Sequence, residues 1–597
     1  MLFRSLLHAA KSAGTVEGLP DSIEGMITAE IDRLPSRDRR ILRYVSVLGM
    51  AFDVGLARAL FDEQDDVGIG VWRRLASFVE DQGAGRYRFQ HALMRDAAYE
   101  GLPYRRRKEL HARVGNAILA STPDQAEVLS LHFFLAGDDR LAWRYSVIAA
   151  RRAESAYANV EASRFFRRAI DVGRRLSEVN ERDLSSLYEA LGDVRERLGD
   201  YPGALAAYRA ARRSMPNEPV LVAQLLLKEA VVTSRAGGYT QSLRRTSRGR
   251  RVLETLQHVE ANRKRARLSA WYAHVRRRQG RRAEAIRWAR RAIEEAKASD
   301  EKEALASAYR TLDLSNVELG RYEDVTHYPL ALAIYEELGD LMEAGTINND
   351  LGAFAYYQGR WDDALGYYEQ AGGLWKRAGD MAAVAIISAN VAEILSDRGQ
   401  LDEAERMGRE ALRIWRAVGL KSAIAYGLNI VGRVTCRSGR YEEALELLEQ
   451  ARDLNHEIGD EPEELESDVR IAECLAMQGR STQALELSTE ALARSETLGG
   501  PATPQLQRVR GCALAQLGRL SEAREALEES VAGARGREAE YEEALALQAL
   551  ARIGAIDGDS DTPELEARYR AIFERLGVVT APVTPIGEAL EPSAPRG

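Results

Sequence analysis

A turn motif that returns at nearly constant intervals constrains this 597-residue chain more than any other feature. The motif begins with glycine and has a small residue, usually alanine, five residues later, as in Gly359 with Ala364. Nine such turns are in phase, with a spacing of about 40 residues, at Gly199, Gly237, Gly280, Gly320, Gly359, Gly399, Gly439, Gly479 and Gly518. A period of this length is typical of solenoids that stack one supersecondary unit per repeat, so the chain does not need several separate globular cores.

The pattern of each repeat predicts a pair of helices joined at the turn glycine. A small residue stands seven positions before most of these glycines, as Gly352 stands before Gly359, and it allows two helices to approach closely. The turn glycine itself suits the left-handed residue that ends a helix. The repeat around Gly320 departs from the pattern, with Asp313 at the small position and Pro329 inside the second helix, and we expect it to be locally distorted.

These residues carry a resemblance to the tetratricopeptide repeat. The closest copy of its pattern consists of Leu191, Gly192, Gly199, Tyr201, Ala204, Tyr208, Ala211 and Pro216. The other repeats resemble a longer form of about 40 residues. The resemblance covers about residues 184–576 and implies an all-α, tetratricopeptide-like superhelical solenoid of about nine units plus a cap, with a general role in protein interaction.

The segment before the repeats has a different pattern. Residues 20–120 predict two amphipathic helices separated by Leu34-Pro35, a further helix, a turn at Gly83-Ala84-Gly85, a short strand over Tyr87 to Phe89, and another helix. This order of helices and a β-wing is that of a small winged-helix domain. Residues 121–183 are expected to form degenerate helical pairs, and residues 577–597 a flexible tail.

The winged-helix region also resembles a segment of the STAND class of signal-transduction NTPases. The resemblance lies in LPDSIEGMITAEIDRLP and YRFQHALMRDAAYEGLPYRRRKELH. In that class, which includes bacterial cyclase-linked and transcription-regulator ATPases, a P-loop module, a winged helix and helical repeats follow one another. The resemblance implies that this chain is the carboxy-terminal part of a larger ATPase, with residues 1–19 as a remnant of the lid helix.

No Gly-x-x-x-x-Gly-Lys-Ser/Thr motif occurs in the sequence, so the backbone cradle that binds a triphosphate is missing. We therefore expect no cofactor and no enzymatic activity on this chain, and ATP or ADP only in a longer parent ATPase or nucleotide cyclase. The resemblance gives His91 a contact to the phosphates of ADP when the missing module is present. The alternative is a half-buried histidine that fixes the wing.

No other constellation points to catalysis or to a metal. His91, His111 and Asp96 repeat no metal-ligand spacing, and no nucleophile accompanies them. The three cysteines stand on the first helices of successive repeats, about a helix diameter apart, which predicts core packing. No apolar run is long enough to cross a membrane as a helix, so we expect a cytoplasmic protein with no membrane partner.

Positive charge is concentrated in one stretch of the array, although the whole chain carries a net charge of −8. Between Gln241 and Arg291 there are 17 basic residues against three acidic ones. Such a belt can steer an acidic partner or nucleic acid. The alternative is that it faces acidic surfaces of the same array or of the missing domain, and the few aromatic residues in it disfavour a platform for single-stranded nucleic acid.

The first helices of a stacked array line its concave face, so the repeat phase also predicts a binding surface. The side chains expected there are Arg267, His274, Arg277, Arg310, Asn349, Tyr356, Tyr426, Asn429 and Arg433. Cations, amides and aromatic rings of this kind suit a peptide groove, and an ordinary solvated helix face is the alternative. The sequence thus favours a sensor or scaffold arm over a DNA-binding transcriptional regulator. The partner of such an arm would be a protein or peptide ligand, a nucleotide-binding domain or a second copy of the chain.

Overall fold

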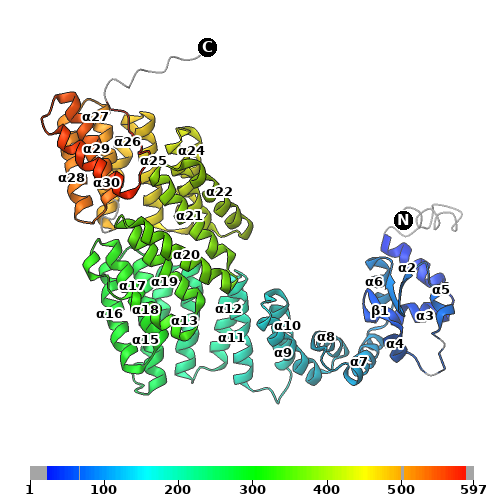
Figure 1. Cartoon of the computed structure of the whole chain (residues 1–597). Helices are drawn as coiled ribbons and strands as arrows, with labels where there is room; N and C mark the ends of the chain where they lie inside the picture. The colour runs from blue at the N-terminus through cyan, green and yellow to red at the C-terminus, as the bar shows by residue number, and fades with distance from the viewer. Residues whose placement is uncertain (1–22, 63, 66, 499–502, 587–597) are drawn as a thin grey trace, which may run out of the picture. The chain divides into compact units, whose positions relative to one another are not determined.

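The computed structural model describes residues 23–586 apart from 63, 66 and 499–502, and in this range it contains 29 α-helices and one three-stranded sheet. The predicted all-α solenoid is therefore confirmed. The chain divides into two compact units, Met1–Glu218 and Pro219–Gly597 (Figure 1). Residues 1–19, interpreted above as a lid-helix remnant, lie outside the described residues.

The first unit begins with short elements around the sheet and continues with longer helices. Its elements are α2 (Ile23–Arg33), α3 (Ser36–Val45), η1 (Ser46–Leu48), β1 (Ala51–Asp53), α4 (Val54–Ala57), η2 (Arg58–Leu60), α5 (Ile69–Arg74), β2 (Val79–Gly83), β3 (Arg86–Phe89), α6 (Ala92–Glu100), α7 (Tyr104–Ser121), α8 (Ala126–Ala136), α9 (Asp139–Ser155), α10 (Asn159–Gly173), α11 (Glu181–Arg197) and α12 (Tyr201–Ser214). The last two are the repeat whose turn glycine is Gly199.

The sheet of the first unit has the strand order β1-β3-β2, and both pairings are antiparallel. Positive φ angles at Gly83, Ala84 and Gly85 make the tight turn between β2 and β3. Phe52 of β1 and Phe89 of β3 are buried, and their rings are 6.0 Å apart. One face of the sheet thus packs on an aromatic core, because successive side chains of a strand point to opposite faces.

The second unit consists of nine helical pairs. They are α13 (Pro219–Arg235) with α14 (Tyr239–Val252), α15 (Val259–Arg278) with α16 (Arg282–Ser299), α17 (Lys302–Glu318) with α18 (Tyr328–Leu338), α19 (Leu341–Tyr357) with α20 (Trp361–Ala378), α21 (Met381–Arg398) with α22 (Leu401–Val418), α23 (Lys421–Arg437) with α24 (Tyr441–Ile458), α25 (Glu461–Gln478) with α26 (Ser481–Thr497), α27 (Thr503–Gln516) with α28 (Leu520–Arg535), and α29 (Glu540–Asp557) with α30 (Thr562–Leu576). The first eight of these pairs, together with α11 and α12 of the first unit, are joined at the nine predicted turn glycines.

The residues of the repeat motif act as expected. All nine turn glycines have φ between +68° and +84°, a conformation that a side chain makes unfavourable. A β-carbon added to Gly352 would lie 2.5 Å from the ring of Tyr368, and one added to Gly432 would lie 2.7 Å from Leu448. A small residue is needed here because a large side chain of the second helix packs on the backbone of the first.

The repeat around Gly320 is distorted, as its departures from the motif predict. A short 3₁₀ turn, η3 (Tyr322–Asp324), replaces the start of the second helix, and α18 has 11 residues where α20 has 18. Asp313 is fully buried and accepts hydrogen bonds from the backbone N–H groups of His327 and Tyr328. The aspartate at the small position therefore satisfies the free donors at the start of α18.

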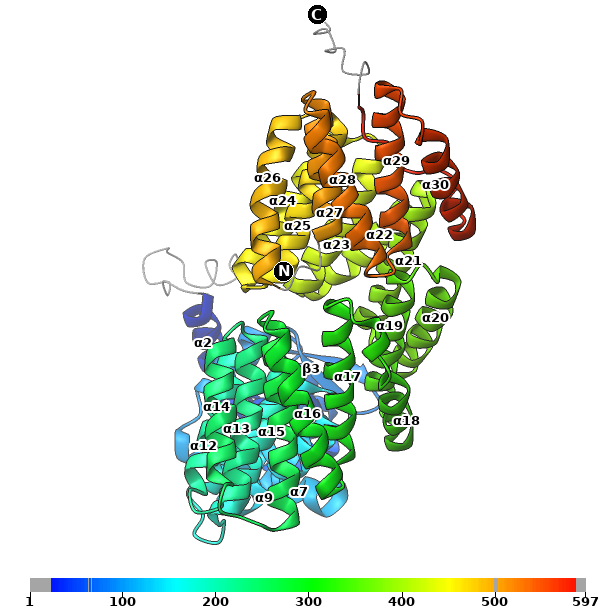
Figure 2. The same cartoon turned by 90° about the vertical axis from the view of Figure 1, so that its left-hand side faces the viewer.

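The second unit makes a full superhelical turn, so that helices from its two halves lie one above the other (Figure 2). A β-carbon added to Gly280 would lie 2.9 Å from the side chain of Leu498, which follows the end of the distant helix α26. Gly320 faces Arg537 and Gly359 faces Leu576 in the same way, at a nearly equal separation in the sequence. The sequence separation of these facing residues is the length of one superhelical turn. Because each repeat has about 40 residues, one turn contains about 5.5 repeats.

Side-chain and backbone contacts join successive turns. Arg278 forms an ion pair with Asp460, and Arg282 donates a hydrogen bond to the carbonyl oxygen of Leu498. The first ten residues of the expected tail also take part, because the N–H of Val579 donates to the carbonyl of Arg398 at 2.9 Å. Ile586 is buried against α27 to α29, so residues 577–586 belong to the folded unit.

Replacement of Ala444 by leucine is expected to lower the free energy of unfolding by about 1–3 kcal/mol, because this fully buried position at a helix contact has no room for a larger side chain. Replacement of Ser242 by alanine, at the equivalent position of another repeat, removes a hydroxyl that donates to the carbonyl of Ala230 and accepts from Nε1 of Trp271, without adding any volume, and we expect a smaller loss. Urea unfolding followed by circular dichroism measures both, and equal losses would contradict the assigned repeat phase.

Candidate functional site

The first helices of the repeats form the inner side of the superhelix. Successive first helices contact one another directly, such as α21 with α23 and α23 with α25, as expected on the shorter side of a curve. All nine side chains predicted for the concave face come from such helices. Arg267, His274 and Arg277 lie on α15, Arg310 on α17, Asn349 and Tyr356 on α19, and Tyr426, Asn429 and Arg433 on α23.

The arginines among them are bound by acidic residues of neighbouring first helices. Arg277 pairs with Glu318 at 2.6 Å, and Arg310 pairs with Asp350 at 2.6 Å. Arg267, which is 35% exposed, contacts Glu301 at 2.8 Å. The partners of Arg277 and Arg310 stand about one repeat away in the sequence, because stacking brings equivalent positions of successive first helices together.

The aromatic and amide side chains form a second set of contacts between repeats. Asn390 joins two of the predicted residues, since its Nδ2 donates to Oδ1 of Asn349 at 2.8 Å and its Oδ1 accepts from the hydroxyl of Tyr426 at 2.7 Å. His274 stacks on Trp271 with ring centroids 4.9 Å apart. Burial, and then the positive charge of Arg277, lower the pKa of His274 well below its ordinary value, so the imidazole is neutral.

Asn429 occupies a different environment from the other predicted residues. Its side chain is only 1% exposed, and among the described residues neither its Oδ1 nor its Nδ2 has a hydrogen-bond partner. The structure therefore places Asn429 between helices rather than on an open face.

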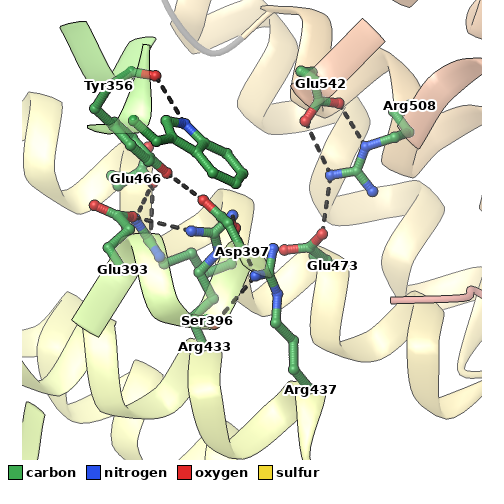
Figure 3. A network of polar contacts seen from close by, with 12 residues as sticks. Tyr356, Glu393, Ser396, Asp397, Arg433, Arg437, Glu466, Glu473, Arg508 and Glu542 are labelled. Atoms are coloured by element: carbon green, nitrogen blue, oxygen red, sulfur yellow. Dashed lines mark hydrogen bonds and ion pairs between the residues drawn. The ribbon is translucent and has the colours of Figure 1, made fainter. Parts of the chain in front are cut away.

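Acidic residues that the sequence analysis did not select hold the centre of the inner side together (Figure 3). Asp397 is fully buried and pairs with Arg433 at 2.9 Å and with Arg437 at 2.6 Å. It also accepts a hydrogen bond from the hydroxyl of Tyr356 at 2.6 Å. Although burial alone would raise the pKa of Asp397, the two guanidinium groups and the hydroxyl hold that pKa below its ordinary value.

The same network extends over two further repeats. Glu393 pairs with Arg433 at 3.1 Å and with Arg470 at 2.9 Å, although Arg470 lies two repeats away from it in the sequence. Arg508 then joins Glu473 and Glu542 at 2.9 and 2.5 Å (Figure 3). A contact between residues two repeats apart indicates strong curvature of the array. Most of these acids stand one repeat away from their arginines in the sequence, and this spacing could have been used to predict the ion pairs.

Tyr357 remains accessible on the inner side. Its side chain is 52% exposed, yet desolvation raises the pKa of Tyr357 far above its ordinary value, followed by the negative charges of Glu393, Glu466 and Glu463. Tyr357 therefore presents an accessible aromatic ring at the end of the first helix α19, near several carboxyl groups. The repeat phase predicted Tyr356 instead, whose hydroxyl donates a hydrogen bond to Asp397.

Glu463 contributes a carboxyl group to the same region. Burial raises the pKa of Glu463 to about 7, as do the charges of Asp460 and Glu466, whereas Arg278 and Arg470 act in the opposite direction. Among the described residues, no hydrogen bond or ion pair of this carboxylate is recorded. The inner side thus combines an accessible phenol ring with a carboxyl group that is not neutralised by a direct partner.

Replacement of Glu463 by glutamine is expected to stabilise the protein at pH 8 by about 1–3 kcal/mol and to have little effect at pH 5. The raised pKa favours the folded state while the carboxyl is protonated, and this contribution is lost as the pH rises from 4.5 through about 7. Urea unfolding at the two pH values tests the prediction. Replacement of the exposed Glu461 by glutamine is the control, and an equal effect of Glu463→Gln at both pH values would contradict the assignment.

His91 lies at the start of α6 and is half-buried, and the structure records no side-chain hydrogen bond for it among the described residues.

His111 is buried, unlike His91. Its Nδ1 lies 2.9 Å from Nδ1 of His132, and its Nε2 lies 2.9 Å from the hydroxyl of Tyr99. Desolvation lowers the pKa of His111 to about 3 and that of His132 to about 4. Within the described residues, no group of three or more His, Cys, Asp or Glu side chains is arranged to hold a metal ion.

The three cysteines Cys436, Cys474 and Cys512 are buried, as core packing predicts. The thiol of Cys436 donates to Sδ of Met477 and that of Cys474 to the carbonyl of Tyr441, both at 3.7 Å, and the neighbouring Cys474, together with burial, raises the pKa of Cys436. In the described part of the chain, no helix is both long and apolar enough to span a membrane.

The basic belt is divided between internal ion pairs and open surface. Arg250 pairs with Glu295 at 2.9 Å and Arg282 pairs with Glu318 at 2.9 Å, which favours the interpretation of internal charge balance for these residues. Arg244, Arg248 and Arg251 are exposed along one face of α14, and none of them has an ion pair with another described residue.

Comparisons with known proteins agree with the repeat architecture. The family described as tetratricopeptide repeat matches residues 343–417, 380–457 and 463–536. None of the curated proteins matches the chain.

Several solved structures are similar to the chain. A STAND protein with a tetratricopeptide repeat sensor from Pyrococcus horikoshii is 15% identical with a TM-score of 0.36, and the match covers 72% of this chain and 65% of that protein. A Rap protein complexed with competence and sporulation factor is 12% identical with a TM-score of 0.41, over 66% of this chain and 98% of that one. The Rap conjugation gene regulator of the plasmid pLS20, in complex with the Phr* peptide, is 16% identical with a TM-score of 0.39, over 53% and 94%. The match to the STAND protein thus spans less than two thirds of that protein. The family match shows that the second unit of this chain contains tetratricopeptide repeats.

Proposed function

We propose that the chain is the sensor and scaffold arm of a STAND-type signalling ATPase and that its repeat array binds a peptide or protein segment on the inner side. The tetratricopeptide repeats support a role in protein interaction, since such arrays present extended concave surfaces. The observation that carries the proposal is that two first helices present an exposed aromatic ring, Tyr357 on α19, and a carboxyl group without a recorded partner among the described residues, Glu463 on α25. An accessible aromatic ring can serve as an anchor, and a carboxyl group without a direct partner suits a basic side chain of the ligand.

Selection of peptides from a displayed random library on the full chain at pH 8, followed by calorimetry with the enriched synthetic peptides, tests this proposal. We expect peptides with at least one lysine or arginine, and we expect Tyr357→Ala and Glu463→Gln each to weaken their binding by about tenfold or more. Tyr157→Ala is the matched control, because this tyrosine is 81% exposed in the first unit. Enriched peptides that bind Tyr357→Ala as tightly as the original chain would reject the inner side as the binding surface.

We also propose that residues 20–120, of which the structure describes those from 23 on apart from 63 and 66, form the winged-helix domain of such an ATPase. The order of α3, β1, α4, α5 and the β2–β3 hairpin, together with the strand order β1-β3-β2, supports this assignment. In a protein that joins the chain to a P-loop module, His91→Ala should then speed the release of ADP. His456→Ala, at a side chain that is 78% exposed in the array, provides the control, and an unchanged ADP release rate in His91→Ala would leave His91 with a packing role.

A further inference from the structure

A cavity of about 380 Å³ in the first unit has a strongly basic lining. It lies between α3 and the connection from α6 to α7, and four arginines line it, Arg39, Arg40, Arg43 and Arg106. No aspartate or glutamate is among the described residues that line it. Its volume falls in the range of small-molecule binding sites, and four guanidinium groups around one space call for an anionic ligand.

The arginines are held in place without using all their donors. Arg39 and Arg43 share the carboxylate of Asp32, which is 2.6 Å from Nη2 of Arg43, and Arg40 pairs with Asp65. The Nε of Arg43 is enclosed and has no hydrogen-bond partner among the described residues. Arg106 donates from Nε to the hydroxyl of Tyr44 and from Nη1 to Glu109. Because each guanidinium has five N–H donors, donors remain for a ligand in the cavity.

Two helices begin at the edge of this cavity. Ser36, the first residue of α3, and Pro103, which precedes α7, both line it. Neither helix start has a side-chain cap. The positive ends of the two helix dipoles therefore add to the charge of the four arginines.

Gly101 allows Arg43 to lie where it does. A β-carbon added at this position would be 2.7 Å from Nε of Arg43, although the backbone conformation itself suits any residue. Replacement by alanine therefore displaces the guanidinium of Arg43 without removing any charge, which makes this variant useful as a test.

We propose that this cavity binds a phosphate-bearing anion of about the size of pyrophosphate. Several guanidinium groups and two helix starts bind an anion with many oxygen atoms more tightly than an anion that has only a single carboxylate. The aromatic ring nearest to the site offers no free face for a nucleobase, because Phe61 stacks on Tyr44 at 5.5 Å and Arg106 also lies over the Tyr44 ring, at 4.9 Å. The recognised chemistry is thus the diphosphate group, whether it is free or part of a larger molecule.

Calorimetry of the full chain with inorganic pyrophosphate at fixed ionic strength tests the proposal. We expect a Kd below about 1 mM, and an affinity about tenfold or more weaker for Arg43→Gln and for Arg106→Gln. Arg105→Gln is the matched control, because Arg105 is next in the sequence, is 94% exposed and does not line the cavity. Absence of saturable binding, or an equal loss in Arg105→Gln, would overturn the proposal.

Two further measurements separate charge from geometry and phosphate from other anions. Gly101→Ala keeps all four arginines and should still weaken pyrophosphate binding, whereas unchanged binding would show that the position of Arg43 does not matter and would count against the site.

ADP should bind no more tightly than pyrophosphate, and malonate should bind more weakly. ADP affinity more than tenfold higher would indicate recognition of a nucleoside, and equal affinity for malonate would indicate a general anion site; either result rejects the pyrophosphate assignment.

Discussion

Replacing Asp397 with asparagine is expected to lower the stability of the second unit by about 3–5 kcal/mol, because the change removes the one ion-pair partner that Arg437 has among the described residues and leaves Arg433 with Glu393 alone. Arg437 is only 3% exposed and Arg433 only 12%, so water cannot take over the role of the carboxylate. Nε and Nη2 of Arg437 already have no hydrogen-bond partner among the described residues, which makes the carboxylate its main compensation.

Hydrogen exchange of the amides in α21 and α23 measures this loss locally, which is needed because an array of repeats does not always unfold in one step. Asp362→Asn is the control. This residue also pairs with an arginine, Arg398, at 2.7 Å, but its side chain is 89% exposed, so we expect a change of less than about 1 kcal/mol. Similar exchange rates in the two variants would contradict the role of the buried network.

Replacing Trp361 with alanine is expected to cost about 3–5 kcal/mol and to loosen two distant parts of the array at once. The indole is 2% exposed and its ring is 5.4 Å from that of Tyr541, which lies on the distant helix α29. Leu576 at the end of α30 belongs to the same apolar cluster. Loss of the indole therefore removes packing both within its own repeat and between successive turns.

Trp375→Ala is the matched control for this experiment. Trp375 is also buried, at 3% exposure, but its Nε1 donates to the carbonyl of Met342 on the paired helix α19, at 3.0 Å. Both variants should lose similar stability. Faster hydrogen exchange in α29 and α30 is expected only for Trp361→Ala, and slow exchange there in both variants would show that the turns are not held together at this point.

The sequence was sufficient to predict the repeat unit, because its determinants are local. A glycine such as Gly439 must adopt a positive φ, and a small residue such as Gly432 must lie beneath a large one, whatever the rest of the chain does. The distortion near Gly320 followed from Asp313 and Pro329 for the same reason.

The inner surface was predicted only in part. The repeat phase placed nine side chains on first helices, but neighbouring positions on a helix differ by about 100° in direction, so it did not distinguish the engaged Tyr356 from the accessible Tyr357. Acids such as Glu393 were not predicted, because a peptide groove was expected to present cations, amides and aromatic rings. The contact of Arg282 with Leu498 depends on small rotations that accumulate over about five repeats, and no local pattern contains that information.

The contacts between turns also restrict how the array can change in length. In an open solenoid, one repeat can be inserted or deleted with new interfaces only at that place. Here, removal of one repeat between Arg282 and Leu498 would shift every later residue by a whole repeat relative to the turn below. Arg278 would no longer meet Asp460, and Gly359 would no longer meet Leu576, so all the pairs would need new partners together. Insertions and deletions should therefore be tolerated in the turns that face solvent, whereas the number of repeats within the superhelical turn should stay constant among proteins that share these contacts.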